Sequence, residues 1–378
     1  MNKNLFSAKD YIDEQIFKLE QQNIFSDTWH FCGLVEDLAE PNDYMTVQAG
    51  NNNLIVYRNE QGELKALHNI CRHRGMQLLE GKGKLSKTIS CPYHDWTYNH
   101  DGELKSLPKA KQDFIGINKK CLSLKQAQAG IWRGMIWVHP NINTAPLSEY
   151  FAPMNQHIAP YEVESLIEAK DYVIEEVINA NWKLVVENYI DHYHLAQLHA
   201  GTLAMYDHKQ ADFGFKGEHF YFWEPLTKDY RTNITQNAPY PMLMNKDDIE
   251  LGAWVPMLFP NVGLVETESS WSVFHVIPIT VNQTKVVIRS KVKNCSMLQF
   301  LKQASTSYSY WRNKIKGKYH SYDSTHALGS GDFMKEDIYV CEQLQKSLSS
   351  PYFEFGPSGD RGEYPIRGFQ KRVLQKLT

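Results

Sequence analysis

Short runs of apolar residues, separated by polar turn-forming residues, characterise the first third of the chain after an initial amphipathic segment. Residues 9–25 place apolar side chains at helical spacing, which predicts a short N-terminal helix. The runs at 54–58 and 63–68 are rich in apolar residues, and the turn-forming residues 59–62 separate them. This arrangement predicts two strands joined by a turn.

The same pattern continues to about residue 140. Within 96–107 the dipeptide Asp101-Gly102 predicts a tight turn between two strands. The run GIWRGMIWVHP, residues 130–140, predicts a closing strand that the final proline ends. These elements together predict a small antiparallel β domain.

Beyond a proline-bearing stretch the pattern becomes a mixture of strands and helices. Strands are predicted at 172–178, 271–279 and 285–292. Helices are predicted at 181–199 and over most of 296–348. The second part of the chain is therefore expected to form an α+β domain.

A length of 378 residues exceeds one small module and suits two domains. We expect three segments along the chain: an N-terminal helical arm at 1–26, the β domain at 27–140 and the α+β domain at 141–378.

Composition excludes several classes of function. A net charge of -3 with 22% charged residues gives no polybasic signal, so neither nucleic acid nor an acidic membrane is an expected partner. No apolar run approaches the roughly 18 residues that a membrane span needs, and the first residues lack the apolar core of a secretory signal. Six cysteines spread along the chain do not resemble a disulfide framework, which favours a reducing, cytoplasmic setting.

The first candidate site contains two cysteines and two histidines. Seventeen residues separate Cys71-x-His73 from Cys91-x-x-His94, and each half comes just after a predicted strand. Structural zinc is one interpretation, but zinc ligand pairs usually leave about two to four residues between them. A Rieske iron–sulfur cluster instead needs two thiolates on one iron and two imidazoles on the other.

The residues CRHRG at 71–75 and CPYHDWTYNHDG at 91–102 resemble the CxHRG…CPYHGWxYxxxG signature of Rieske proteins. The resemblance implies a [2Fe-2S] cluster with four ligands: Cys71, His73, Cys91 and His94. Asp95 stands where that family often has glycine. Histidine ligation raises the reduction potential above that of an all-cysteine cluster. The domain is therefore expected to relay electrons from a ferredoxin or flavin reductase.

The second candidate site lies in the predicted helix 181–199. One face of this helix is apolar, and the opposite face carries acids and histidines, which is ordinarily a solvated surface. On an ideal helix His199 lies about 140° from His194 but is nearly aligned with His192. Either His192 pairs with His199, or the helix ends or bulges between 194 and 199 so that His194 and His199 converge.

This segment resembles the (D/E)-x3-D-x2-H-x4-H motif of Rieske non-heme iron oxygenases. Its four positions are Glu187, Asp191, His194 and His199. The resemblance implies that His194 and His199 bind one mononuclear Fe(II), with His192 as a bystander. Such a site needs one carboxylate to complete a facial triad that leaves positions open for O₂ and substrate.

The third ligand is expected in the segment 331–348. Asp332 and Asp337 are both possible from the residues alone, and either could simply cap the helix. In the resembled family the ligand aspartate opens a helix and a glutamate follows five residues later. That pattern selects Asp337, followed by Glu342, and leaves Asp332 and Glu336 as alternatives.

For the whole chain, the resemblance implies a small antiparallel β Rieske domain followed by a larger, helix-grip-like α+β catalytic domain with mononuclear iron. It implies a terminal oxygenase that hydroxylates or oxidatively demethylates a small substrate, either an aromatic compound or a quaternary ammonium or N-methyl compound. Electrons would come from NAD(P)H through a separate reductase, since the sequence contains no GxGxxG unit. The alternative is a Rieske-type electron carrier or a zinc-stabilised binding module.

The resemblance also implies a head-to-tail homotrimer, in which the cluster of one chain serves the iron of the next. Asp191 would then link an iron-binding histidine, His194, to His94 of the neighbouring chain. It is therefore the one expected catalytic residue that is not a metal ligand.

Overall fold

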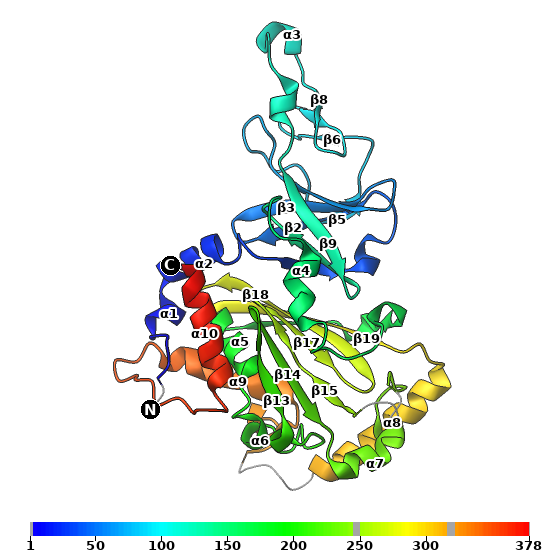
Figure 1. Ribbon diagram of the computed structural model, residues 1–378, viewed down its shortest axis with the longest axis vertical. Helices are drawn as coiled ribbons and strands as arrows, with labels where there is room; N and C mark the ends of the chain where they lie inside the picture. Colours follow the sequence, from blue (N-terminus) through cyan, green and yellow to red (C-terminus); the bar gives the residue numbers. More distant parts are fainter. Residues whose placement is uncertain (1–2, 245–249, 316–321, 378) are drawn as a thin grey trace. The chain divides into compact units, whose positions relative to one another are not determined.

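The computed structural model of the chain divides into two compact units (Figure 1). Residues 19–152 form one, called here the β unit; residues 1–18 and 153–378 form the other, called the α+β unit. The residues described are 3–244, 250–315 and 322–377. The predicted segment limits after residues 26 and 140 differ from this division and stay predictions.

Ten strands form the β unit, in the described part of the chain. They are β1 (His30–Leu34), β2 (Asp43–Ala49), β3 (Asn52–Arg58), β4 (Leu64–His68), β5 (Lys82–Lys84), β6 (Ile89–Ser90), β7 (Thr97–Tyr98), β8 (Leu104–Ser106), β9 (Gln126–Trp132) and β10 (Met135–His139). One sheet has the order β1-β10-β9-β4-β3-β2-β5 and a smaller one the order β6-β7-β8. Their strands pair antiparallel, as predicted.

The predicted strand at 130–140 is a hairpin instead. It consists of the end of β9, a two-residue turn and β10. Arg133 and Gly134 form the turn with φ of 50° and 69°. Positive φ at both central residues is what a type I′ turn requires, and it matches the twist of the flanking strands. An arginine in the first turn position is uncommon there, so the sequence pattern concealed the turn.

Nine strands form the sheet of the α+β unit in its described residues. They are β11 (Ile167–Glu168), β12 (Ile174–Ile178), β13 (Asp212–Lys216), β14 (His219–Pro225), β15 (Gly252–Trp254), β16 (Met257–Leu258), β17 (Val262–Glu266), β18 (Ser270–Thr280) and β19 (Gln283–Val292). The main path is β11-β19-β18-β17-β15-β14-β13. Three of these strands confirm the predictions at 172–178, 271–279 and 285–292.

The described helices are α1 (Lys9–Ile12), α2 (Glu14–Asn23), α3 (Ala110–Asp113), α4 (Leu147–Phe151), α5 (Trp182–Ile190), α6 (Leu195–Leu198), α7 (Lys228–Asn237), α8 (Met297–Ile315), α9 (Phe333–Ser347) and α10 (Tyr364–Leu377). Part of the predicted helical region 296–348 lies outside the described residues, at 316–321. None of the helices described combines the length and the apolar character needed to cross a bilayer.

Helix α5 occupies the centre of the α+β unit. It packs on β18 and β19 and against α9 and α10 (Figure 1). Its first turn is capped by Asn181, whose side-chain oxygen accepts the N–H of Lys183 at 3.0 Å. This packing buries seven of its nine residues. The combination of an antiparallel sheet with packed helices confirms the predicted α+β class.

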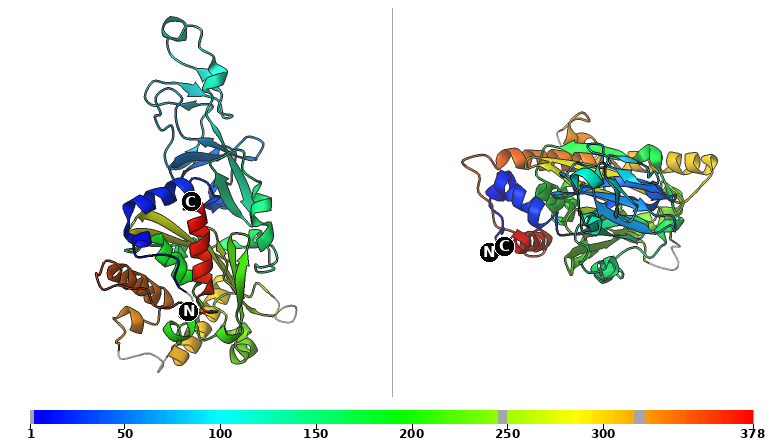
Figure 2. Two further views of the ribbon diagram at one scale, coloured as in Figure 1. Left: turned by 60° about the vertical axis from the view of Figure 1, so that its left-hand side comes forward. Right: turned by 90° about the horizontal axis from the view of Figure 1, so that it is seen from above.

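A buried hydrogen-bond network connects α5 to both terminal segments of the unit. The Tyr11 hydroxyl donates to the Glu187 carboxylate at 2.8 Å, and the Gln370 amide donates to it at 3.0 Å. These three residues come from α1, α5 and α10, and the first segment of the chain runs beside α10 (Figure 2). Burial raises the pKa of Glu187 to about 7, although Gln370 and Tyr11 oppose the shift.

We expect the Glu187→Gln variant to show a pH-dependent difference in stability from the wild type. The folded pKa of about 7 exceeds the ordinary value of 4.5, so wild-type stability from this group is lost as pH rises between those values. Glutamine does not ionise. The variant should therefore gain roughly 1–3 kcal/mol relative to the wild type between pH 5 and pH 8.

Urea denaturation at four pH values measures this difference. Glu176→Gln, on an exposed position of β12, is the matched control and should show no such trend. A constant difference between Glu187→Gln and the wild type from pH 5 to 8 would contradict the expectation.

Candidate metal centres

Two loops of the β unit share one backbone conformation. They span 71–76, which follow β4, and 91–96, between β6 and β7. In each loop the cysteine N–H donates to the carbonyl five residues later, at 2.8 Å in the first and 2.9 Å in the second. The N–H four residues after the cysteine donates back to the cysteine carbonyl, at 3.0 and 2.9 Å. Both predicted ligand pairs are therefore presented by equivalent turns.

Asp95 occupies the position in the second loop that Gly75 occupies in the first. Both have positive φ, 79° for Gly75 and 53° for Asp95. Glycine adopts this left-handed conformation without strain, and aspartate tolerates it better than most other residues. The departure from the usual glycine thus keeps the same backbone turn.

The four predicted cluster ligands lie together at these loops. Cys71 and Cys91 are buried, and the rings of His73 and His94 are 4.7 Å apart, edge to face. The ring of His73 stacks on Trp96 at 4.8 Å. Its Nδ1 atom is buried and has no hydrogen-bond partner among the described residues. Two thiolates beside two imidazoles, one with an orphaned ring nitrogen, form a donor set that fits a Rieske cluster.

One contact in this region was not anticipated from the sequence. The Tyr98 hydroxyl lies 3.2 Å from the Cys71 sulfur and accepts the N–H of Arg72 at 3.0 Å. Hydrogen bonds to cluster sulfurs raise the reduction potential. Tyr98 lies in the hairpin that follows the second ligand pair, and this position is the only sequence signal for its contact with the first pair.

The predicted continuous helix at 181–199 is wrong in length. Helix α5 ends at Ile190, and the backbone at Asp191 turns to an extended conformation. The Asp191 side chain accepts the N–H of Tyr193 at 2.8 Å, which stabilises the new turn. Helix α6 follows, with His194 and His199 at its two ends. Helix α5 therefore ends before both histidines, and α6 ends at Leu198, so the helix does end between 194 and 199 as the second alternative anticipated, and the two histidines converge.

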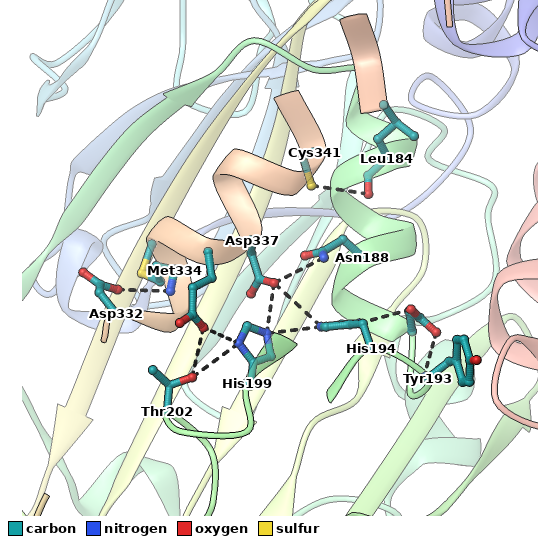
Figure 3. Close-up of polar contacts among 12 residues, drawn as sticks. Leu184, Asn188, Tyr193, His194, His199, Thr202, Asp332, Met334, Asp337 and Cys341 are labelled. Carbon is teal, nitrogen blue, oxygen red and sulfur yellow. Dashed lines mark hydrogen bonds and ion pairs between the residues drawn. The ribbon is translucent and has the colours of Figure 1, made fainter. Parts of the chain in front are cut away.

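His194, His199 and Asp337 form the one group in the described residues whose side chains gather as a single-ion site (Figure 3). The Nε2 atoms of the two histidines are 3.2 Å apart. The Oδ1 atom of Asp337 lies 3.0 Å from Nε2 of His199 and 3.7 Å from Nε2 of His194. Metal–ligand bonds of about 2.1 Å at right angles place neighbouring ligand atoms about 3 Å apart. The donor set and its spacing fit a mononuclear iron.

The arrangement of the four side chains at 71–94 also bears on the zinc interpretation. A tetrahedral zinc would gather all four ligand atoms of the 71–94 set around one point. Those four side chains do not form such a group within the described residues. A cluster with two irons, each holding two of the four, accounts for the arrangement.

A second carboxylate stands behind each histidine of the ion site. Asp191 Oδ2 lies 3.1 Å from Nδ1 of His194, and Glu336 Oε2 lies 2.8 Å from Nδ1 of His199. A carboxylate on the other ring nitrogen selects the tautomer and orients the ring of a metal-binding histidine. Glu336, an alternative iron ligand from the sequence, thus contacts a ring nitrogen of His199 instead of joining the three-residue group.

The remaining alternatives have other partners. Asp332 caps α9 by accepting the N–H groups of Met334 and Lys335, the helix-capping role considered for it. His192 points to the carbonyl of His208, at 2.7 Å, and lies away from the ion site. Glu342 accepts the side-chain amide of Asn179 at 2.9 Å.

Two further polar residues of this centre were missed. Asn188 donates to Asp337 Oδ1 at 3.2 Å, and Thr202 donates to Glu336 at 3.0 Å (Figure 3). Both hold a carboxylate and neither has a motif. The only signal for Asn188 is an amide one turn before Asp191 on a largely buried helix.

The protonation of His199 follows from these neighbours. Burial lowers its pKa, but hydrogen bonds to Asp337 and Glu336 and their charges outweigh burial and raise the pKa to about 9. The carboxylates thus create a strongly negative position for a cation.

A cavity of about 430 Å³ opens beside the ion site. His194, His199 and Asp337 line it, together with a wall of mostly apolar and aromatic side chains. The cavity is large enough for a small organic molecule. The ion site therefore combines a set of protein donor atoms with adjacent space for a reactant.

Two family models match the chain. The model described as the ring hydroxylating alpha subunit, catalytic domain, matches residues 161–378, and the Rieske [2Fe-2S] domain matches residues 28–127. These matches confirm the two predicted cofactors, a Rieske cluster and a mononuclear iron. A domain for catalysis beside the Rieske domain also disfavours the alternative of an electron carrier alone.

Three curated relatives illustrate the similarity. The glycine betaine monooxygenase oxygenase subunit of Chromohalobacter salexigens is 35% identical over 195 residues, 51% of this chain and 42% of that protein. The carnitine monooxygenase oxygenase subunit of Acinetobacter pittii is 32% identical over 50% of this chain and 51% of its own length. The large oxygenase component of the naphthalene 1,2-dioxygenase system of Pseudomonas putida is 34% identical, over 50% and 43%. The chain thus spans about half the length of the curated relatives it matches.

Solved structures share the fold over almost the whole chain. The quaternary ammonium Rieske monooxygenase CntA with L-carnitine has a TM-score of 0.72 and 21% identity, covering 99% of this chain and 95% of that one. Naphthalene 1,2-dioxygenase from Rhodococcus sp. has a TM-score of 0.70 and 17% identity, covering 98% and 93%. At this identity the likeness establishes the fold.

We expect Glu336→Ala to weaken binding of Fe(II) at the ion site by about 10- to 100-fold, because the His199 ring loses the partner that orients it. Titration of iron-depleted protein with Fe(II), with the cluster content checked separately, measures this loss. Glu342→Ala, on the same helix but bonded to Asn179, is the control and should bind as the wild type does. Equal Fe(II) affinity in the two variants would contradict the orienting role of Glu336.

Proposed function

The chain belongs to the family of ring-hydroxylating alpha subunits, and from this membership we propose that it is the terminal oxygenase of a multi-component system. The observation that carries the proposal is the His194, His199 and Asp337 site beside a cavity, in a chain that also has a Rieske domain. The reaction would join R–H, O₂, NAD(P)H and H⁺ to give R–OH, H₂O and NAD(P)⁺. Hydroxylation of an N-methyl group would be followed by loss of formaldehyde, which is oxidative demethylation.

Each centre has its own set of residues in this proposal. Cys71, His73, Cys91 and His94 would hold the cluster, and His194, His199 and Asp337 would hold the mononuclear iron. When bound, the cluster supplies single electrons and the Fe(II) supplies the position at which O₂ is reduced.

Other residues of the chain would orient the ligand side chains and exclude water from the site. Asn188 would keep the Asp337 carboxylate turned toward the histidines, to which its Oδ1 lies at 3.0 and 3.7 Å. Glu336 and Asp191 would keep Nε2 of each ring free of a proton and directed at the ion. The apolar wall of the cavity would exclude water, which protects a reactive site from side reactions.

Asp191 would also transmit electrons between subunits. We propose a head-to-tail homotrimer in which Asp191 accepts a hydrogen bond from His94 of the neighbouring subunit while it holds His194. A carboxylate shared by two histidines couples the protonation of one centre to the other. A separate ferredoxin or flavin reductase would deliver electrons from NAD(P)H, and the protein would act in the cytoplasm.

The substrate class follows from the relatives only in outline. Their names include oxygenases for glycine betaine and carnitine, and one for naphthalene. The substrate proposed here is accordingly a small organic molecule, either a quaternary ammonium or N-methyl compound or an arene.

Purified protein tests the proposal directly. It should be red-brown, contain about three irons per chain, and give a rhombic paramagnetic signal on reduction. With a reductase it should consume NADH and O₂ in the presence of methylammonium compounds or aromatic acids. A colourless protein that carries zinc would overturn the assignment as an oxygenase.

Asp191→Ala, assayed with enough Fe(II) to fill the ion site, should retain its cluster but lose nearly all turnover, at least about 100-fold, because electrons no longer pass between subunits. Iron and sulfide content, single-turnover product yield and steady-state O₂ consumption together measure this effect. His192→Asn is the matched control, since the hydrogen bond described for His192 goes to the carbonyl of His208 and its ring packs on Phe213 and Phe222, not on the ion site. Full activity in Asp191→Ala would remove electron transfer between subunits from the proposal.

A further inference from the structure

The cavity beside the ion site contains more acid than the metal chemistry uses. Four carboxylates line it, and no lysine or arginine is among its lining residues in the described ranges. The four are Asp191, Glu224, Glu268 and Asp337. The inner surface of this cavity is therefore biased toward negative charge.

Three of these carboxylates have partners. Asp191 and Asp337 contact His194 and His199 at the ion site. Glu224 lies 2.7 Å from the Nδ1 atom of His208. These contacts leave Glu268 as the cavity acid that lies beside neither the ion site nor a histidine among the contacts described.

Glu268 is only 4% exposed and lies in the turn between β17 and β18. One oxygen accepts the Tyr230 hydroxyl at 3.3 Å. The other oxygen is buried and has no hydrogen-bond partner in the described part of the chain. A buried carboxylate oxygen without a partner is costly, so such a group calls for a partner that the described contacts do not supply.

Aromatic rings line the cavity together with this acid. Tyr206, Tyr230 and Phe222 line the same cavity. Burial raises the pKa of Tyr206, and the charges of Glu268 and Glu224 raise it further, which requires the three groups to be close. The face of an aromatic ring attracts a cation, and most strongly a desolvated one.

We propose that Glu268 and these rings form a subsite for the cationic end of the substrate, an ammonium group that carries N-methyl groups. This inference rests on the proposed oxygenase function and selects the cationic class from its two substrate classes. A quaternary ammonium offers no N–H group, so an aromatic wall with one carboxylate satisfies it fully. A neutral arene would leave the Glu268 carboxylate without a partner. The carboxylate of an aromatic acid would be repelled by it.

The state of Glu268 before binding is consistent with this role. Burial raises its pKa, while hydrogen bonds to its own backbone and from Tyr230 oppose the shift. Burial thus disfavours the charged form of Glu268 relative to water, and a bound cation would favour that form. Glu268 would be a specificity-determining residue, since it would contact the cationic group of the substrate without being a ligand of the iron.

Binding of a matched pair of small molecules tests the proposal. Choline and 3,3-dimethylbutan-1-ol have the same shape and differ in the charge of one central atom. Calorimetry with iron-loaded protein and no reductant should give choline at least about tenfold tighter binding than the neutral alcohol. In Glu268→Gln this preference should fall about tenfold, with binding of the alcohol changed by less than about twofold.

Glu250→Gln is the matched control, because Glu250 is exposed and pairs with Arg231 outside the cavity. It should keep the full preference for choline. The wild-type comparison decides the matter by itself if Glu268→Gln does not fold. Equal binding of the two molecules, or binding of neither, would overturn the cationic subsite, as would an unchanged preference in Glu268→Gln.

The binding assay separates this inference from the function on which it rests. Because no reductant is present, cation preference is measured without turnover. Preference for choline in a protein that lacks NADH-dependent O₂ consumption would support the subsite while removing the oxygenase proposal. Turnover of a neutral arene without cation preference would do the reverse.

Discussion

The packing of α9 on α5 is the constraint on which the metal site depends. Asp337 stands 138 residues after His199, and the packing of α9 on α5, which leads into α6, brings the carboxylate to the two imidazoles. Buried contacts along the pair hold its register, including the one between the Cys341 sulfur and the Leu184 carbonyl (Figure 3). A slip of one helical turn, about 5.4 Å, would remove Asp337 from reach of both histidines.

Each histidine of the site has an acid beside its Nδ1 atom. Asp191 ends α5 by bonding the backbone of Tyr193 and also fixes the ring of His194. Glu336 lies fully buried beside His199, a position that is stable because His199 and Thr202 surround it. Buried carboxylates without such partners are costly, so the acids of this region occur in bonded arrangements. Two acids depart from this rule through one oxygen each: Glu336 Oε1 and Glu268 Oε2 are buried and have no hydrogen-bond partner in the described part of the chain.

The cluster loops depend on a different device. Their two turns repeat the same pair of backbone hydrogen bonds, so one local conformation is used twice to present a cysteine and a histidine. Gly75 and Asp95 provide the left-handed residue in each. The short β6-β7-β8 sheet and the β4 end then supply rigid supports at which these turns begin.

The sequence by itself determined the chemistry of both centres. The spacing of Cys71, His73, Cys91 and His94, and the later histidine motif, select their ligand types because metals demand particular donors in a fixed number. Local patterns also predicted most strands and the Asp101-Gly102 turn, since alternation and turn residues act over a few positions.

Only the tertiary structure decided the rest. The tertiary structure decides where α5 ends, which acid lies beside both imidazoles and which lies behind one of them. These contacts, like those of Glu268 in the cavity, join segments far apart in the chain. Asp332, Glu336 and Asp337 are near neighbours in sequence, yet their contacts differ. Asp332 caps α9, Glu336 bonds the outer ring nitrogen of His199, and Asp337 lies at the ion site. The 3.6-residue helical repeat turns them to different sides, and long-range packing determines what each side meets.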